Sequence, residues 1–144
     1  MTYRAPSHRH KGVPGYPRNY IGEGKVIDIF HAPGRSTPMA KVEFGDKTSL
    51  LLVPEGLRVN QTVNIGSGSK IEMGNILPIQ EIPEGTLVHN VESVPGDGGK
   101  YVRTAGTSAT IITRGNKVTL QMPSGAFKSF DGRCMATVGI LANS

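Results

Sequence analysis

Apolar and polar residues alternate along short stretches of this chain, and turn residues separate the stretches. In the first half the apolar runs are GKVIDIF (24–30), MAKVEF (39–44), SLLLV (49–53) and VNQTVNI (59–65). A period near two with many β-branched residues predicts strands. Gly45-Asp46 predicts a hairpin turn between the second and third runs, and Pro54-Glu55-Gly56 predicts a turn after the third. Four or five short strands spaced by turns favour a small barrel of the oligonucleotide-binding (OB) type.

The second half repeats this pattern after a Gly- and Ser-rich segment, residues 66–79, that predicts a boundary between two lobes. Its runs are TLVHNVES (86–93), KYVRTA (100–105), SATIITR (108–114), KVTLQM (117–122), AFKSF (126–130) and MATVGIL (135–141). Most of the intervening turns carry Gly, Asn or Pro, the residues that accept a positive or fixed φ. Six strands predict a second small barrel, and no stretch has a convincing helical period. The predicted fold class is therefore all-β with two small barrels.

Residues 1–20 differ from the rest, because they mix Pro, Gly, His and basic residues without an apolar period. Such a segment cannot bury enough surface to fold alone. The predicted organisation is a basic flexible arm over residues 1–20, one lobe over residues 21–75 and a second lobe over residues 76–144.

Basic charge is concentrated at the two ends of the chain, whose net charge is +5. Residues 1–20 carry four Lys or Arg and no carboxylate, and residues 100–144 carry six with only Asp131. The middle, residues 21–99, holds six basic and ten acidic residues. Clustered cations neutralise neighbouring phosphates and release their counterions, so this distribution favours a nucleic-acid partner over ordinary solvated charge.

Several function classes lack the residues they need. Cys134 is the only cysteine, so an internal disulfide and a zinc ribbon are both excluded, and nothing in the sequence pairs it with a histidine for nucleophilic catalysis. His8 and His10 could bind a metal only weakly, and a Walker-type phosphate loop is absent. No signal peptide or membrane-length apolar run is present. We therefore expect a soluble, intracellular protein without enzyme activity, cofactor, metal or small-molecule substrate.

The best candidate for RNA contact is residues 95–110, PGDGGKYVRTAGTSAT, where Lys100 and Arg103 stand among small residues. Small side chains let the backbone approach a sugar-phosphate chain, and the hydroxyls of Thr104, Thr107 and Ser108 can bond phosphate or ribose oxygens. A wide turn between two strands is the alternative reading.

Three segments together carry a family resemblance: GNILPIQEIPEGTLVHNVES, PGDGGKYVRTAGTSA and LQMPSGAFKSFDGRCMATVGILAN. They resemble the body of the universal ribosomal protein two of the large subunit, and YRAPSHR and GKVIDIFHAPGRSTPMAKVEF resemble the arm and first lobe of its archaeal and eukaryotic form. The resemblance implies an OB lobe followed by an SH3-like lobe, and a cytoplasmic ribosomal protein. The implied partners are 23S-type rRNA near the peptidyl transferase region and neighbouring ribosomal proteins, with a role in subunit association.

The resemblance also adds candidate residues to those suggested by charge. It implies basic contacts facing the gap between the lobes and an RNA-facing loop that runs from His89 to Ser108, where His89 could instead order the loop. The residues predicted to contact RNA are Arg4, Arg9, Lys11, Arg18, Lys25, Arg35, Lys47, His89, Asn90, Lys100, Arg103, Thr104, Gly106, Thr107, Ser108, Arg114 and Lys117.

Two departures from the family limit what is carried over. Nothing in this sequence matches the Gly- and Arg-rich leader or the long basic C-terminal extension of family members. We therefore expect either a trimmed or reconstructed core or a reduced member of the family, and we transfer no role in peptide-bond formation. The runner-up function is a general single-strand-binding or ribosome-assembly protein. Such a protein would usually present stacking aromatics, which are scarce here, and an enzyme lacks any candidate residue pair.

Overall fold

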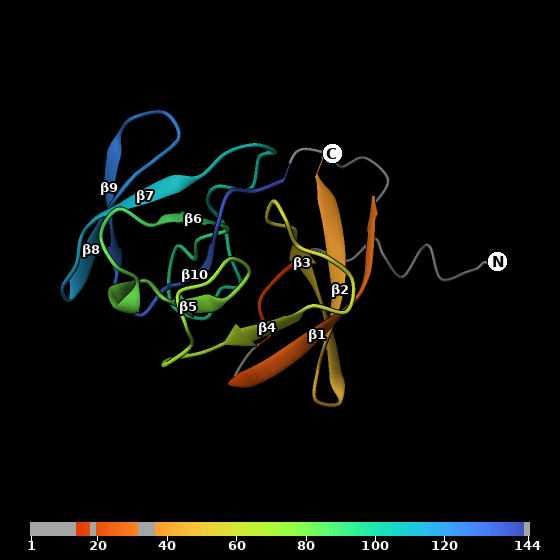
Figure 1. Cartoon of the computed structure of the whole chain (residues 1–144). Helices are drawn as coiled ribbons and strands as arrows, with labels where there is room; N and C mark the ends of the chain where they lie inside the picture. The colour runs from red at the N-terminus through yellow and green to blue at the C-terminus, as the bar shows by residue number, and fades with distance from the viewer. Residues whose placement is uncertain (1–13, 18–19, 32–36, 143–144) are drawn as a thin grey trace.

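The computed structural model describes residues 14–17, 20–31 and 37–142, and these residues form an all-β structure (Figure 1). The strands are β1 (Gly22–His31), β2 (Pro38–Phe44), β3 (Lys47–Leu52), β4 (Thr62–Ile65), β5 (Ile76–Pro78), β6 (Leu87–His89), β7 (Ala109–Thr113), β8 (Lys117–Gln121), β9 (Phe127–Asp131) and β10 (Met135–Val138). One 3-10 turn, η1 (Ile79–Glu81), is the only helical element in this part of the chain. The predicted all-β class is confirmed.

The ten strands are hydrogen-bonded in the order β3-β2-β1-β4-β5-β10-β6-β7-β8-β9. All pairs are antiparallel except β4 and β5, which meet in parallel at Ile65 and Ile76. The last strand, β10, lies between β5 and β6, so the end of the chain joins the two series of strands. Figure 1 shows β1 to β3 on one side of the molecule and β7 to β9 on the other.

Strand β1 shows how the sequence pattern becomes structure. Val26 is fully buried, whereas Lys25 before it and Asp28 two residues after it are exposed. The pairing with β2 shifts register between Val26 and Asp28. A bulge of this kind accommodates the consecutive apolar residues Val26 and Ile27, which strict alternation does not allow.

Two main clusters of buried apolar side chains fill the molecule, one in each half. Those of the first half are Tyr16, Val26, Ala40, Val42, Phe44, Leu51, Val53, Val63, Ile65, Ile76 and Ala142. Those of the second half are Leu77, Ile79, Ile82, Val88, Val91, Ala109, Ile111, Val118, Leu120, Phe130, Cys134, Ala136 and Val138. Two cores are what two small barrels require, whereas the boundaries of the arm and lobes stay predictions.

The C-terminal segment returns from the second half to the first. Glu55 N–H donates to the carbonyl of Ile140 at 2.8 Å, and Ala142 N–H donates to the carbonyl of Val53 at 2.8 Å. Leu141 is fully buried and packs with Met39 and Leu52 in a third, small cluster. The two halves therefore share backbone hydrogen bonds as well as the continuous strand series.

One local prediction differs from the structure, and another stays a prediction. Residues 66–79, predicted to hold the boundary between the lobes, include β5, which pairs with β10, and the boundary itself is not tested by this pairing. Residues 100–105, predicted as a strand, form only a single bridge between Tyr101 and Val91. Val102 has a φ of 59°, and this left-handed conformation interrupts an extended ladder.

The described residues contain no helix that could cross a membrane.

Candidate nucleic-acid interface

Two carboxylates shape the turn at residues 93–99 that precedes the predicted RNA-facing loop. Asp97 accepts hydrogen bonds from the Ser93 hydroxyl and from the backbone N–H groups of Ser93, Val94 and Gly99. Desolvation raises its pKa, but the bonds from Ser93, Gly99 and Val94 outweigh this and lower the pKa of Asp97. The hydrogen bonds to this charged side chain therefore fix the conformation of the turn.

The second carboxylate, Glu92, is only 2% exposed and holds the same turn from inside. Its Oε1 accepts the N–H groups of Gly96 at 3.2 Å and Met135 at 2.8 Å, and its Oε2 accepts the N–H of Gly98 at 2.9 Å. A buried carboxylate needs such partners because desolvation is costly. Glu92 thus joins the turn to β10.

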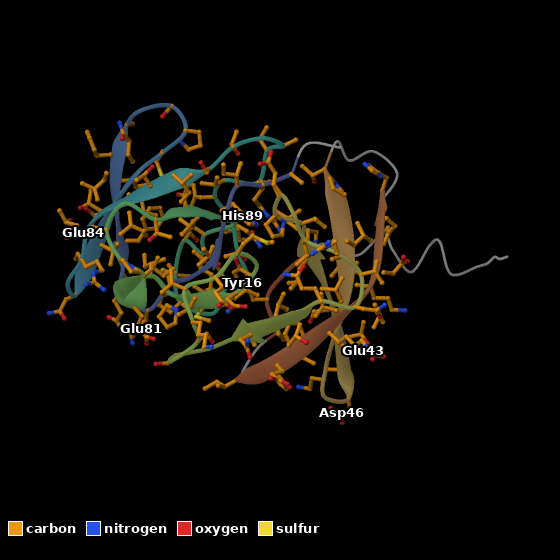
Figure 2. All side chains as sticks on the ribbon, viewed as in Figure 1. Tyr16, Glu43, Asp46, Glu81, Glu84 and His89 are labelled. Atoms are coloured by element: carbon orange, nitrogen blue, oxygen red, sulfur yellow. The ribbon has the colours of Figure 1, made fainter. Side chains whose placement is uncertain are left out.

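His89 and Asn90, which the sequence predicted to contact RNA, lie beneath the surface of the loop. Their exposed fractions are 0% and 1%. The Nδ1 of His89 lies 2.9 Å from the carbonyl of Gly139, and burial lowers the pKa of His89 to about 4. Figure 2 shows His89 in the interior between the two halves. Burial leaves these side chains positioned to support the loop, in line with the ordering role considered for His89.

The backbone over Asn90 is closely packed and conformationally unusual. A Cβ on Gly99 would lie 2.2 Å from Asn90 Oδ1. Asn90 and Val102 have φ values of 52° and 59°, and the Asn90 N–H donates to the Val102 carbonyl at 2.9 Å. A β-branched residue in the left-handed region is strained, and such strain is concentrated at functional sites. This observation supports a functional role for the loop.

The surface of the loop is formed by the remaining predicted residues. Lys100, Thr104 and Gly106 are exposed, and Thr107 and Ser108 are half-buried. Two backbone hydrogen bonds fix the loop to the C-terminal segment. Gly106 N–H donates to the Leu141 carbonyl at 2.8 Å, and Leu141 N–H donates to the Thr107 carbonyl at 3.0 Å. The Thr107 hydroxyl donates to the Thr104 carbonyl at 2.5 Å, which leaves its oxygen able to accept.

Arg103 is half-buried, and its Nη2 donates to the carbonyl of Pro14 at 2.5 Å. Pro14 begins a segment, residues 14–17, that we name the strap. Gly15 N–H donates to Leu50 in β3 at 3.0 Å, and Tyr16 N–H donates to Gly98 at 3.2 Å. The strap therefore connects an edge of the first half to the loop of the second half that the sequence predicts to face RNA.

Tyr16 is the centre of the strap. Its ring is 7% exposed and belongs to the core of the first half. Its hydroxyl donates to the Asn90 carbonyl at 2.5 Å and lies 2.6 Å from Thr137 Oγ1, so the Thr137 hydroxyl can donate to it. Burial raises the pKa of Tyr16 far above its ordinary value, which keeps the hydroxyl protonated. Figure 2 shows Tyr16 between the two halves, although the sequence predicted that this residue belongs to a flexible arm.

The other predicted basic residues lie apart from this loop or outside the described residues. Lys25 is exposed on β1, and Lys47 follows Asp46 at the β2–β3 hairpin, which Figure 2 shows far from His89. Arg114 and Lys117 are exposed at the β7–β8 turn. Arg4, Arg9, Lys11, Arg18 and Arg35 lie outside the described residues.

Sequence reasoning missed one cation near the loop, Lys128 on β9. Its Nζ lies 5.3 Å from the centre of the Tyr101 ring and 5.9 Å from that of Phe130. Lys128 therefore places a positive charge beside Tyr101, the residue that follows Lys100 in the chain. Its residue type was visible, but its proximity to Tyr101 depends on the packing of β9 against a residue 27 positions earlier in the chain, and no local sequence signal predicts that contact.

The described residues offer no centre for catalysis by metal or thiol. No group of three His, Cys, Asp or Glu side chains in this part of the structure could hold a metal ion. Cys134 is buried, and desolvation raises its pKa to about 11, so its thiol is a poor nucleophile.

The sequence of this chain is similar to those of known proteins. Residues 72–144 match the family model described as Ribosomal Proteins L2, C-terminal domain. The chain belongs to the L2 family of ribosomal proteins. The sequence resembles the archaeal and eukaryotic form of this family, and the archaeal type is supported by relatives described as large ribosomal subunit protein uL2. The chain is 45% identical to that of Methanothermobacter thermautotrophicus over 150 residues and 47% identical to that of Methanosphaera stadtmanae over 150 residues.

The L2 relatives are longer than this chain. In both comparisons the alignment covers 98% of this chain and 62% of the relative. For the relative from Haloquadratum walsbyi, 46% identical over 146 residues, the alignment covers 60% of the relative. The chain thus spans about three fifths of the length of the L2 proteins it matches, and its residues 72–144 match the model of the family's C-terminal domain.

Proposed function

We propose that this L2-family chain is a structural, non-enzymatic constituent of the large ribosomal subunit in the cytoplasm. It binds 23S-type rRNA near the peptidyl transferase region, contacts neighbouring ribosomal proteins and supports subunit association. The observation that carries this proposal is the loop at residues 98–108, where exposed Lys100 and small residues are held on a buried scaffold in an L2-family chain. Rigid placement lowers the entropy cost of ordering such a loop on RNA.

Recognition of folded rRNA fits this surface better than stacking of single-stranded bases. Of the large aromatic side chains in the described part of the chain, Phe127 is the one most exposed, at 64%. The Tyr101 ring already contacts the Lys128 ammonium and packs edge-on against Phe130. Phosphate and ribose contacts therefore carry the binding, together with the shape of the RNA.

The test is a filter-binding titration of the full chain with a folded rRNA fragment. With about 4–6 phosphate contacts, affinity should fall by roughly two to three decades between about 50 and 200 mM salt. Flat salt dependence, or equal competition by poly-dT, would contradict the proposal and favour the single-strand-binding alternative.

Lys100→Ala localises the contact to the loop. Lys100 is exposed, so the substitution should weaken RNA binding and reduce the salt slope by about 1 without lowering the melting temperature. Arg58→Ala, an exposed arginine outside the loop, is the matched control and should leave RNA affinity unchanged. Equal effects of the two substitutions would mean that the charge acts only through the general field of the protein.

A further inference from the structure

A cleft of about 720 Å³ opens where the strap meets both halves of the molecule. Its size lies within the range of small-ligand sites, about 300–1,000 Å³. The strap and the residues after it provide Tyr16, Pro17, Tyr20 and Ile21, whereas the two halves provide Ile65, Pro78, Pro95 and Met135 among others. These rings and aliphatic side chains give the cleft apolar walls, suited to a flat apolar group.

Two charged residues line the same cleft. Glu92 is 2% exposed and uses three acceptor positions on the backbone N–H groups of Gly96, Gly98 and Met135. A carboxylate offers about four such positions, so one remains for a ligand donor. Gly96 and Met135 also line the cleft, which places the carboxylate among the lining residues.

The second charged residue, Arg133, is held in place by a fixed partner. Its Nε donates to Asp131 Oδ1 at 3.1 Å, and its Nη2 donates to Asp131 Oδ2 at 2.8 Å. These bonds orient the planar guanidinium and leave Nη1 for a second anion. The side chain is 72% exposed, so Arg133 reaches the solvent side of the cleft.

We propose that this cleft binds a single unstacked nucleotide of RNA. The base lies against the apolar walls, an exocyclic amine of the base donates to Glu92, and the phosphate accepts from Arg133. The proposal rests on the proposed RNA-binding function and adds a site that is separate from the loop at residues 98–108. A lysine or arginine side chain from a partner protein is disfavoured, because Arg133 would repel it.

The arrangement also predicts which bases fit. Adenine, cytosine and guanine carry an exocyclic amine that can donate to Glu92. Uracil has carbonyl oxygens on both sides of its N3–H, and the carboxylate repels them. Binding should therefore be weaker for UMP than for AMP, CMP and GMP, by about tenfold if one charge-assisted hydrogen bond is lost.

The experiment is a titration of the full chain with each nucleoside monophosphate, followed by the ¹H–¹⁵N resonances of Gly96, Gly98 and Met135. Adenosine is titrated alongside AMP to isolate the phosphate contact. AMP should bind more tightly than adenosine, and Arg133→Gln should remove that difference. Arg58→Gln, an exposed arginine outside the cleft, is the matched control and should preserve it.

Absence of shifts at these amides, equal binding of AMP and adenosine, or an unchanged difference in Arg133→Gln would overturn the proposal. Binding of the folded rRNA fragment is measured on the same samples. If rRNA binding and its salt dependence persist while nucleotides cause no shift of these amide resonances, the cleft proposal fails and the proposed function stands. If nucleotides bind the cleft but rRNA does not bind, the proposed function fails instead.

Discussion

At the scale of single residues, His89 shows how a polar side chain is used inside a small β protein. It is fully buried, and its Nδ1 lies 2.9 Å from the Gly139 carbonyl. Because a carbonyl only accepts, the neutral ring carries its proton on Nδ1. The Nε2 atom has no hydrogen-bond partner among the described residues, so protonation there would place an unpaired charge in the interior.

The first prediction is that acid destabilises the protein through His89. Burial lowers its folded-state pKa to about 4 from the ordinary value of 6.5. The unfolded chain therefore takes up a proton as the pH falls from 6.5 to 4, whereas the folded chain does not. The free energy of unfolding should fall across this window by at most about 3 kcal/mol, and the stabilisation is fully present above pH 6.5.

Urea unfolding at a series of pH values measures this effect. His89→Gln retains an N–H donor for Gly139 but cannot titrate, so it should flatten the pH dependence. His31→Gln, at an exposed position on β1, should keep the dependence because it retains His89. A slope that survives in His89→Gln would assign the acid sensitivity to other groups.

At the scale of elements, the loop at residues 98–108 depends on a glycine with no room for a side chain. Gly99 and Gly96 both have left-handed φ values, 109° and 89°. A Cβ on Gly99 would lie 2.2 Å from Asn90 Oδ1, whereas one on Gly96 would meet nothing within 4 Å. The two glycines therefore separate the cost of backbone conformation from the cost of a clash.

The second prediction compares Gly99→Ala with Gly96→Ala. Both substitutions carry the left-handed strain, about 1 to 2 kcal/mol. Gly99→Ala should lose about 1–3 kcal/mol more because it overpacks the site above Asn90. Chemical unfolding of the two variants gives the difference directly. Equal losses would mean that the loop moves away from Asn90 without cost.

The elements differ in how far the sequence predicts them. The β2–β3 hairpin and the β7–β8 turn follow from Gly45-Asp46 and Arg114-Gly115-Asn116, because turn residues act locally. The position of β10 between β5 and β6 has no local signal, since pairing depends on the whole fold. The predicted strand at residues 100–105 was wrong because alternation in KYVRTA says nothing of the left-handed φ at Val102.

The candidate site was predicted in part for the same reason. Residue type and local composition identified the loop with Lys100 and Arg103. They could not distinguish exposed Lys100 from buried His89 and Asn90, because both kinds of residue fit an alternating strand. The contact of Tyr16 with Asn90 spans 74 positions of the sequence, and that distance explains why the strap was interpreted as part of a flexible arm.

At the scale of the whole molecule, the strap connects the two cores. The Tyr16 ring belongs to the core of the first half, whereas its hydroxyl bonds to Asn90 and Thr137 in the second. Arg103 and Leu50 fix the start of the same segment through Pro14 and Gly15. The orientation of the loop relative to the first half therefore depends on a few hydrogen bonds, and an RNA surface shared by both halves needs that orientation.

The last prediction is that Tyr16→Phe loosens this connection without disturbing the first core. The phenyl ring can occupy the same space, but the Asn90 carbonyl and the Thr137 hydroxyl lose a buried partner. Thr137 is 5% exposed, so water cannot readily replace the tyrosine hydroxyl. The free energy of unfolding should fall by about 1–3 kcal/mol.

Tyr20→Phe is the matched control, because the Tyr20 hydroxyl donates to the Glu23 carbonyl at 3.0 Å in an exposed setting. There water can replace the lost bond, so the loss should be less than about 1 kcal/mol. Hydrogen exchange adds a readout for the connection itself. In Tyr16→Phe the amides of Gly15 and Tyr16, which donate to Leu50 and Gly98, should exchange faster, whereas those of β8 and β9 should not change. Equal stability losses in the two variants, with unchanged exchange in the strap, would show that the hydroxyl of Tyr16 does not hold the two halves together.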